Sequence, residues 1–361
     1  MSEVIKYKLL GKTPGELKEI AAQCGLPSYA GGQIAQWLYK KKVKTIDEMT
    51  NLSKAGREKL SERYETGAVA YSDCRESSDG TKKYLFPVTC AFGGGLNGIE
   101  GENPGKVESG SIEAVMIPEL DRKTLCVSSQ AGCKMGCKFC MTGRQGFHGN
   151  LSAADILSQF ISVDEAADLT GTVFMGMGEP LDNYENVRRA IEVLTADWGF
   201  GWSPKRITLS SIGVLPNLKR YLDETRCHLA ISMHDAFPDE RGELMPVQKA
   251  YPLKDVISLI RQYDFTGQRR VSFEYTMFSG FNDDKRHADG IIRLLSGLEC
   301  RVNLIRFHKI PDFPYVSSPE GVMEVFRDRL NKAGITSTIR ASRGEDIFAA
   351  CGMLAGKHGD K

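Results

Sequence analysis

Three cysteines lie close together in the sequence, at Cys133, Cys137 and Cys140. Only ten cysteines occur in 361 residues, which is too few for a scaffold held together by disulfides. The first residues contain no apolar stretch typical of an export signal, so we expect a cytoplasmic protein whose thiols stay reduced. In a reducing compartment, clustered cysteines are typical of a metal or redox site.

The spacing of these cysteines predicts an iron–sulfur cluster. Three thiolates on one short loop can hold three irons of a [4Fe-4S] cluster and leave the fourth iron open to a small molecule. A structural zinc site is the alternative, with Cys126 or His148 as the fourth ligand that such a site needs. That alternative would make the chain a zinc-stabilised RNA-binding protein without enzymatic activity. Brown protein that contains iron and sulfide would support the cluster.

The elements that must position these cysteines alternate between strand-like and helical runs. Six strand–helix units predict a parallel sheet with right-handed crossovers. Because six units are fewer than a closed barrel needs, we expect an α/β fold with a partial (β/α)6 barrel; an open doubly wound sheet is the alternative. The predicted strands are 124–128, 171–177, 206–210, 228–233, 271–277, 301–307 and a last run at 336–340, and the predicted helices are 152–168, 183–196, 214–222, 253–263, 284–296 and 319–333.

The remaining sequence predicts three parts. Residues 1–75 are expected to form a small helical accessory domain that binds RNA, 76–120 a β-rich connector with a glycine-rich loop at 93–110, and 121–361 the catalytic domain. Lysines cluster at 40–44 in the first part, and they form either a solvated helix end or a contact to phosphates. A net charge of +1 excludes a basic surface over the whole protein.

Longer stretches of sequence carry a resemblance to a known family. The cysteine loop resembles that of the radical S-adenosylmethionine (SAM) enzymes. Residues 130–143 (QAGCKMGCKFCMTG), 174–180 (FMGMGEP) and 343–352 (RGEDIFAACG) are similar to the RNA adenine methyltransferases of the RlmN/Cfr type, and the similarity extends over nearly the whole chain. The resemblance implies a [4Fe-4S] cluster on the three cysteines and two SAM molecules per turnover, one of which is cleaved to a 5′-deoxyadenosyl radical.

The resemblance also implies SAM contacts at the ends of successive strands. Gly178 and Glu179 follow the second strand, where a backbone without a side chain allows close approach and a carboxylate can accept from an amino group. At His308 the family pattern has an asparagine, and an imidazole could replace that contact. The other implied contacts are Ser210, Ser232, Met233 and His234.

Three further residues receive catalytic roles from the resemblance. A lone cysteine is ordinarily a small buried hydrophobic residue, but Cys351 matches the residue that accepts a methyl group from SAM. Cys126 matches the resolving cysteine, which releases the product and forms a transient disulfide with Cys351. Glu113 matches the proton acceptor.

By resemblance, the substrate is an adenosine of the peptidyl-transferase region of 23S rRNA, methylated at C2. Many members of the family also modify the adenosine next to the tRNA anticodon. Methylation at C8, as in relatives that confer antibiotic resistance, is the alternative within the same family. An electron donor such as flavodoxin or ferredoxin is the expected protein partner.

Overall fold

The computed structural model describes residues 6–91, 107–267 and 269–355. Most of the glycine-rich loop expected at 93–110 therefore lies outside the described residues. The central element is one ten-stranded sheet with strands in the order β14-β13-β12-β11-β10-β9-β6-β5-β4-β3. Its strands are β3 (Asp73–Glu76), β4 (Lys82–Ala91), β5 (Val107–Glu119), β6 (Arg122–Cys126), β9 (Gly171–Phe174), β10 (Ile207–Ser211), β11 (His228–Ser232), β12 (Val271–Met277), β13 (Arg301–Arg306) and β14 (Thr336–Ile339).

The parallel part of this sheet confirms the expected partial barrel. Strand β6 pairs in parallel with β9, and β9 to β14 then pair in parallel, each with the next one along the chain. A doubly wound sheet would reverse its strand order at a switch point, and this sheet does not. The sheet remains open, and its strands coincide closely with those predicted from the sequence. The run at 336–340 forms a seventh parallel strand, β14.

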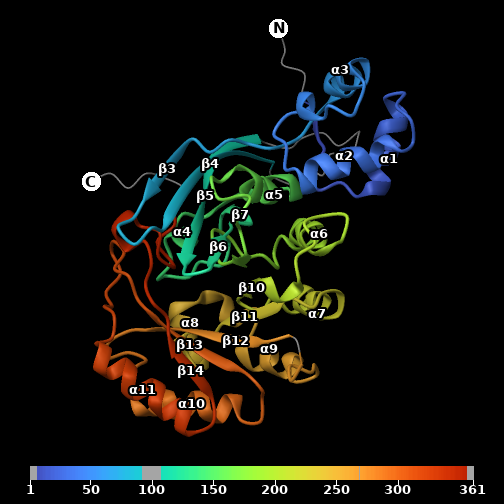
Figure 1. The fold of residues 1–361 in the computed structure, drawn as a ribbon. Coiled ribbons are helices and arrows are strands. Elements are labelled where there is room, and N and C mark those ends of the chain that lie inside the picture. The colour runs from blue at the N-terminus through green and yellow to red at the C-terminus, as the bar shows by residue number, and fades with distance from the viewer. Residues whose placement is uncertain (1–5, 92–106, 268, 356–361) are drawn as a thin grey trace.

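Amphipathic helices connect the parallel strands. Helices α5, α6, α7 and α9 lie along one side of the sheet (Figure 1), as right-handed crossovers between consecutive strands require. The sequence analysis did not predict the short helix α8, which begins at a proline. The helices of this part are α5 (Ala153–Ser162), α6 (Tyr184–Thr195), α7 (Leu215–Glu224), α8 (Pro238–Leu244), α9 (Leu253–Ile260), α10 (Lys285–Leu295) and α11 (Glu320–Lys332).

The segment expected to be a β-rich connector continues the main sheet. Strand β4 pairs antiparallel with β3 on one side and with β5 on the other, and β5 pairs antiparallel with β6. In this register Val115 lies opposite both Lys83 and Cys126. Directly opposed side chains share one face of a sheet, and side chains alternate between faces along a strand. Lys83, Cys126 and Glu113 therefore project from the same face.

The first part of the chain is helical, as predicted. Its helices are α1 (Pro14–Gln23), α2 (Ala30–Ala35) and α3 (Lys54–Arg63), with a π-helical turn at Gln36–Lys40 and a 3-10 turn at Ile46–Glu48. Two short strands, β1 (Tyr7–Lys8) and β2 (Tyr64–Glu65), pair beside them. Thr13 and Glu16 form a capping box that starts α1. Within the described ranges, no helix combines the length and the apolar character that a membrane crossing requires.

Candidate active site

The cysteine loop lies between two short paired strands, β7 (Gln130–Gly132) and β8 (Phe147–Asn150), and contains the one-turn helix α4 (Met141–Arg144). The Cys133 amide donates to the Gly146 carbonyl at 2.8 Å. Gly132 has a positive φ of 72°, and a Cβ there would lie 2.0 Å from the same carbonyl oxygen, so only glycine fits. The loop is thus fixed at its first cysteine.

The three thiols of this loop lie in each other's electrostatic field. Burial raises the pKa of Cys133 to about 12, and Cys140 adds to the shift. Burial also raises the pKa of Cys137 far above its ordinary value, with further contributions from Cys140 and Cys133. Only a strong positive charge keeps three such thiolates together, and iron–sulfur clusters are held by cysteine thiolates. This donor set fits a [4Fe-4S] cluster.

Glu179 is a buried carboxylate in the loop that follows β9, close to the cysteine loop. It accepts hydrogen bonds from the Leu181 and Ile212 amides, each at 3.0 Å. Burial raises its pKa to about 7. The preceding Gly178 has a φ of 98°, and a Cβ at this position would lie 2.5 Å from the Gln130 side chain. Gly178 therefore brings the turn against the strand that precedes the cysteines.

His234 follows β11 and packs against the cysteine loop. Its ring lies edge-on to Phe139, with 4.8 Å between the ring centroids. Its Nδ1 accepts from the Thr276 amide at 3.1 Å, so the neutral ring carries its proton on Nε2. Burial lowers the pKa of His234 to about 3, so the ring stays neutral at physiological pH. The adjoining Met233 is fully buried, and Ser232 and Ser210 are half-buried at the ends of their strands.

Arg241 was not singled out from the sequence, although it organises the end of β11. Its fully buried guanidinium donates to the carbonyls of Ser232 and Met233, both at 3.0 Å. A lone arginine on a short helix carries no local signal for such a role. Its contact with two of the predicted SAM-contact residues appears only in the folded chain.

His308 is buried, and both of its ring nitrogens have protein partners. Nδ1 lies 3.3 Å from a Glu345 carboxylate oxygen, and Nε2 lies 3.2 Å from the Ser342 hydroxyl. These contacts join the end of β13 to the segment that leads to Cys351. A contact between His308 and SAM stays a prediction, and it requires the release of one of these two partners.

The segment that carries Cys351 lies directly on the cysteine loop. The Met141 amide donates to the Gly352 carbonyl at 2.8 Å, and the Thr142 hydroxyl donates to the Leu354 carbonyl at 2.7 Å. Met141 immediately follows Cys140, so Cys351 is held beside the predicted cluster ligands. Cys351 itself is exposed. The protein atoms around it still raise the pKa of its thiol, and the Arg340 guanidinium acts in the opposite direction.

Glu113 contacts the same C-terminal segment from β5. One carboxylate oxygen accepts from the Ala355 amide at 2.7 Å, and the other lies 2.9 Å from the Lys83 ammonium. Lys83 also donates to the Phe348 carbonyl at 3.3 Å. Both charged side chains are buried. The sequence analysis missed Lys83, because an isolated lysine on a strand reveals its partner only once the strand register is known.

Cys126 lies at the end of β6 and is buried. Burial raises the pKa of its thiol to about 12, with a further contribution from Cys351, whereas Arg340 lowers it. Arg340, also missed from the sequence, follows β14, and its Nε lies 3.6 Å from a Glu274 carboxylate oxygen. The fold therefore gathers Glu113, Cys126 and Cys351 from three distant segments.

Comparisons with known proteins agree with this arrangement. The sequence pattern of the Radical SAM superfamily matches residues 127–289, and that of the ribosomal RNA large subunit methyltransferase N-terminal domain matches residues 7–66. The crystal structure of a radical SAM methyltransferase from Sphaerobacter thermophilus superimposes with a TM-score of 0.86 at 35% sequence identity, over 97% of this chain and 100% of that chain.

Curated relatives match nearly the full length of the chain. A probable dual-specificity RNA methyltransferase RlmN from Porphyromonas gingivalis is 56% identical over 97% of this chain and 94% of its own. The corresponding protein of Parabacteroides distasonis is 53% identical over 98% and 97%, and the dual-specificity RNA methyltransferase RlmN of Syntrophus aciditrophicus is 39% identical over 95% and 94%. The chain therefore belongs to the RlmN family of dual-specificity RNA methyltransferases, within the radical SAM superfamily.

Proposed function

We propose that this protein methylates C2 of adenosine in the peptidyl-transferase region of 23S rRNA and next to the anticodon of tRNA. The observation that carries the proposal is the attachment of the Cys351 segment to α4, directly after Cys140. A cysteine that receives a methyl group and then passes it to RNA must lie beside the site where SAM is cleaved. The family identity supports RNA as the substrate.

Membership in the radical SAM superfamily implies a [4Fe-4S] cluster and SAM. Cys133, Cys137 and Cys140 would hold the cluster, while Glu179 and His234 line the adjacent strand ends. When bound, the cluster would supply the single electron that cleaves one SAM to a 5′-deoxyadenosyl radical, and the S-methyl group of Cys351 would be the source of the hydrogen atom that this radical takes. Flavodoxin or ferredoxin is the proposed source of that electron.

Cys351 is the proposed methyl carrier, because adenine C2 is electron-poor and does not attack SAM directly. The Cys351 thiolate displaces the methyl group from the sulfonium of one SAM, which leaves as S-adenosylhomocysteine, so each turnover uses two SAM molecules. Arg340 favours the thiolate form. The exposure of Cys351 allows a methyl donor and then an RNA base to reach the same sulfur.

Glu113 and Cys126 act in the proposed second half of the reaction. After the methylene carbon on Cys351 joins the adenine ring, Glu113 accepts the ring proton, and Lys83 balances the buried carboxylate charge. The ring radical also has to give up one electron, and the cluster would be the acceptor for it. The Cys126 thiolate then attacks the Cys351 sulfur, which forms a disulfide and breaks the bond between that sulfur and the methylene carbon. The electron pair of the broken bond stays with the methylene carbon of the departing base, which takes up one proton to become the methyl group. Arg340 adjoins both cysteines and favours the thiolate of Cys126 as well.

The proposed RNA contact of the N-terminal part includes a cavity of about 650 Å³ lined by Lys40, Lys41 and Lys44. Aromatic side chains from the catalytic part, Phe200 and Trp202, line the same cavity. Lys42 differs from its neighbours, because its ammonium is partly buried and donates to the Ala166 carbonyl. Replacement of the other three lysines should weaken RNA binding and make the affinity less dependent on salt concentration. Unchanged binding would show that these lysines do not contact RNA.

Nucleoside analysis by mass spectrometry tests the proposed reaction. Ribosomal RNA and tRNA from cells that lack this protein should lose 2-methyladenosine, and the expressed protein should restore it in both. Appearance of 8-methyladenosine would instead assign the C8 reaction, and restoration in rRNA alone would exclude tRNA as a substrate. Reconstituted protein that never releases 5′-deoxyadenosine with dithionite and SAM would contradict radical chemistry.

A further inference from the structure

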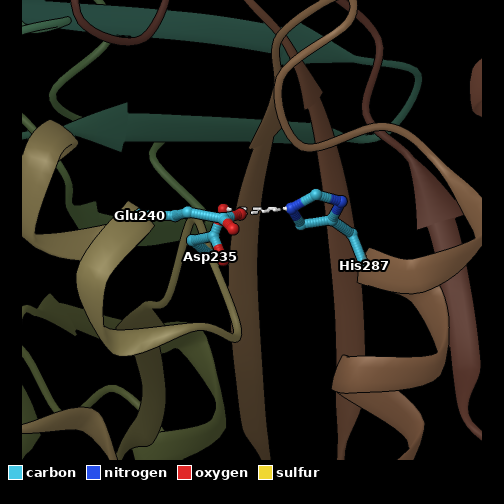
Figure 2. Close-up of side chains that lie close together, drawn as sticks. All are labelled: Asp235, Glu240 and His287. Carbon is cyan, nitrogen blue, oxygen red and sulfur yellow. Dashed lines mark hydrogen bonds and ion pairs between the residues drawn. The ribbon is translucent and has the colours of Figure 1, made fainter.

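A second cluster of ligand-type side chains lies outside the proposed reaction centre. It comprises Asp235 from the loop after β11, Glu240 from α8 and His287 from the first turn of α10. One ligand atom of each residue lies within 4.8 Å of the ligand atoms of the other two. Figure 2 shows the two carboxylates on one side, facing the imidazole on the other. No local motif predicts this cluster, because its members come from three separate elements.

Asp235 leaves one carboxylate oxygen without a partner. Oδ1 accepts from the Phe237 amide at 2.7 Å, whereas Oδ2 has no hydrogen bond and lies 3.8 Å from His287 Nε2. The residue has no exposed surface. Buried polar atoms are almost always satisfied, and a buried carboxylate oxygen without a partner is costly. The nearby Arg241 does not supply the partner, because its hydrogen bonds go to carbonyl oxygens and to Gln248.

The other two members are oriented by a second layer of contacts. His287 Nδ1 lies 2.7 Å from an Asp284 carboxylate oxygen, and Nε2 lies 2.6 Å from Glu240 Oε2. Histidines that bind metals commonly direct their other ring nitrogen to a carboxylate in this way. Glu240 uses its second oxygen to bind Arg286 at 2.7 Å. One nitrogen and two oxygens thus point into a common space, and each of the three side chains has a fixed direction.

We propose that Asp235, Glu240 and His287 bind a divalent transition-metal ion, with zinc as the best-matched species. Zinc accepts imidazole nitrogen and carboxylate oxygen together, and it takes water as its fourth ligand when the protein supplies three. The ion replaces the hydrogen bond between His287 Nε2 and Glu240 Oε2, whose proton leaves to solvent, and it satisfies Asp235 Oδ2. The site is separate from the three cysteines that hold the iron–sulfur cluster, and zinc binding there does not depend on the proposed RNA methylation.

The position of this site places the ion, with water as its fourth ligand, next to the SAM-contact residues. Asp235 directly follows His234, and α8 carries Arg241, which holds the Ser232 and Met233 carbonyls. A metal bridge from Asp235 and Glu240 to His287 would fix this loop and α8 against α10. Its loss should loosen the end of β11 without removing the cluster ligands.

The test is a zinc titration of the anaerobically assembled holoprotein, with metal content measured by plasma mass spectrometry and unfolding followed by thermal scans. After removal of loosely bound metal, the wild type should retain one more zinc ion per chain than Asp235→Asn or Glu240→Gln, at the same iron content. Added zinc should raise the unfolding temperature of the wild type by several degrees and leave that of both variants unchanged. Asp284→Asn should weaken zinc binding by about 10- to 100-fold, as loss of an outer carboxylate does.

Asp239→Asn is the matched control, because this exposed neighbour in α8 changes the charge equally without belonging to the cluster; it should behave like the wild type. If Asp235→Asn folds poorly, the half-buried Glu240→Gln variant decides alone. Equal zinc content and equal thermal shifts in the wild type and Glu240→Gln would overturn the proposal. His287 would then be an imidazole that only joins α8 to α10 by hydrogen bonds.

Discussion

The cysteine loop and the Cys351 segment are neighbours in space, but they are built in opposite ways. Cys133, Cys137 and Cys140 lie within one loop that the short β7–β8 pair closes. The Cys351 segment is held from outside, by α4, by Glu113 through Ala355, and by His308 through Ser342 and Glu345. The Glu113–Ala355 contact alone joins residues 242 positions apart.

The geometry of the cysteine loop therefore depends mainly on local contacts, whereas the geometry of the Cys351 segment depends on contacts with distant parts of the chain. Ligands grouped on one loop keep their spacing when distant contacts change. A sulfur carrier that must accept a methyl group, reach RNA and meet Cys126 needs a support that can be adjusted from several sides. We therefore expect substitutions around the Cys351 segment to alter methyl transfer while leaving the iron content intact.

The largest effect should come from the carrier itself. Cys351→Ala should lower RNA methylation by roughly a thousandfold or more, as loss of a nucleophile does, while iron and sulfide content stay at the wild-type level. Cys137→Ala should abolish methylation too, but with loss of iron. Metal analysis beside a methylation assay separates the two; loss of iron in Cys351→Ala would contradict the separation of the two regions.

The next effect concerns the buried ion pair behind the segment. Lys83→Met removes the ammonium that faces the buried Glu113 carboxylate, and it should reduce the free energy of unfolding by about 3–5 kcal/mol. The double variant Lys83→Met/Glu113→Gln should recover much of that stability, because no buried charge remains. Chemical denaturation of the single and double variants measures this. Equal stability of Lys83→Met and the wild type would show that the pair is not buried as described.

A smaller, pH-dependent effect is expected on the cysteine-loop side, at Glu179. Its folded-state pKa of about 7 lies above the ordinary value of 4.5, so its protonated form stabilises the fold at low pH. That contribution should be lost as the pH rises from about 4.5 to about 7, because over this range the carboxyl ionises in the unfolded chain but stays protonated in the folded one. Glu179→Gln should unfold with a weaker pH dependence in this window. An unchanged profile would indicate that Glu179 has a lower pKa than its burial implies.

The smallest effect is expected at the outer end of the Cys351 segment. Asp346 accepts from the Ser77 hydroxyl and from the Ser78 amide in the turn between β3 and β4. Asp346→Ala should speed amide exchange in residues 344–355 and lower methylation a few-fold, with no change in iron content. Asp168→Asn, at an exposed ion pair far along the chain, is the control. Unaltered exchange would show that this turn does not support the segment.

The sequence was informative wherever structure follows from local pattern. Alternating strand and helix runs located the parallel sheet, because period and length distinguish the two kinds of element. The helix at Pro238–Leu244 was missed, since it is only seven residues long and is preceded by no clear cap. The antiparallel continuation through β3–β5 was also missed, because strand pairing is not encoded in either strand alone.

The residues of the site also divide into those that local sequence predicts and those that only the folded chain reveals. The three cysteines on one loop and the residues at strand ends could be named from motifs and from the rule that parallel strands end together. Lys83, Arg241 and Arg340 could not be named, because each acts through a partner that only the folded chain brings near. Their roles depend on charge and burial, which a linear pattern does not record.

The most direct test of the account is the fate of RNA bound to the Cys126→Ala variant. This variant should accept methyl and join RNA, but it lacks the thiolate that releases the product, so a covalent adduct should accumulate. Digestion and mass spectrometry should then find an adenosine linked through one carbon to Cys351. Free 2-methyladenosine in RNA at the wild-type yield, with no adduct, would contradict the shared action of Cys126 and Cys351.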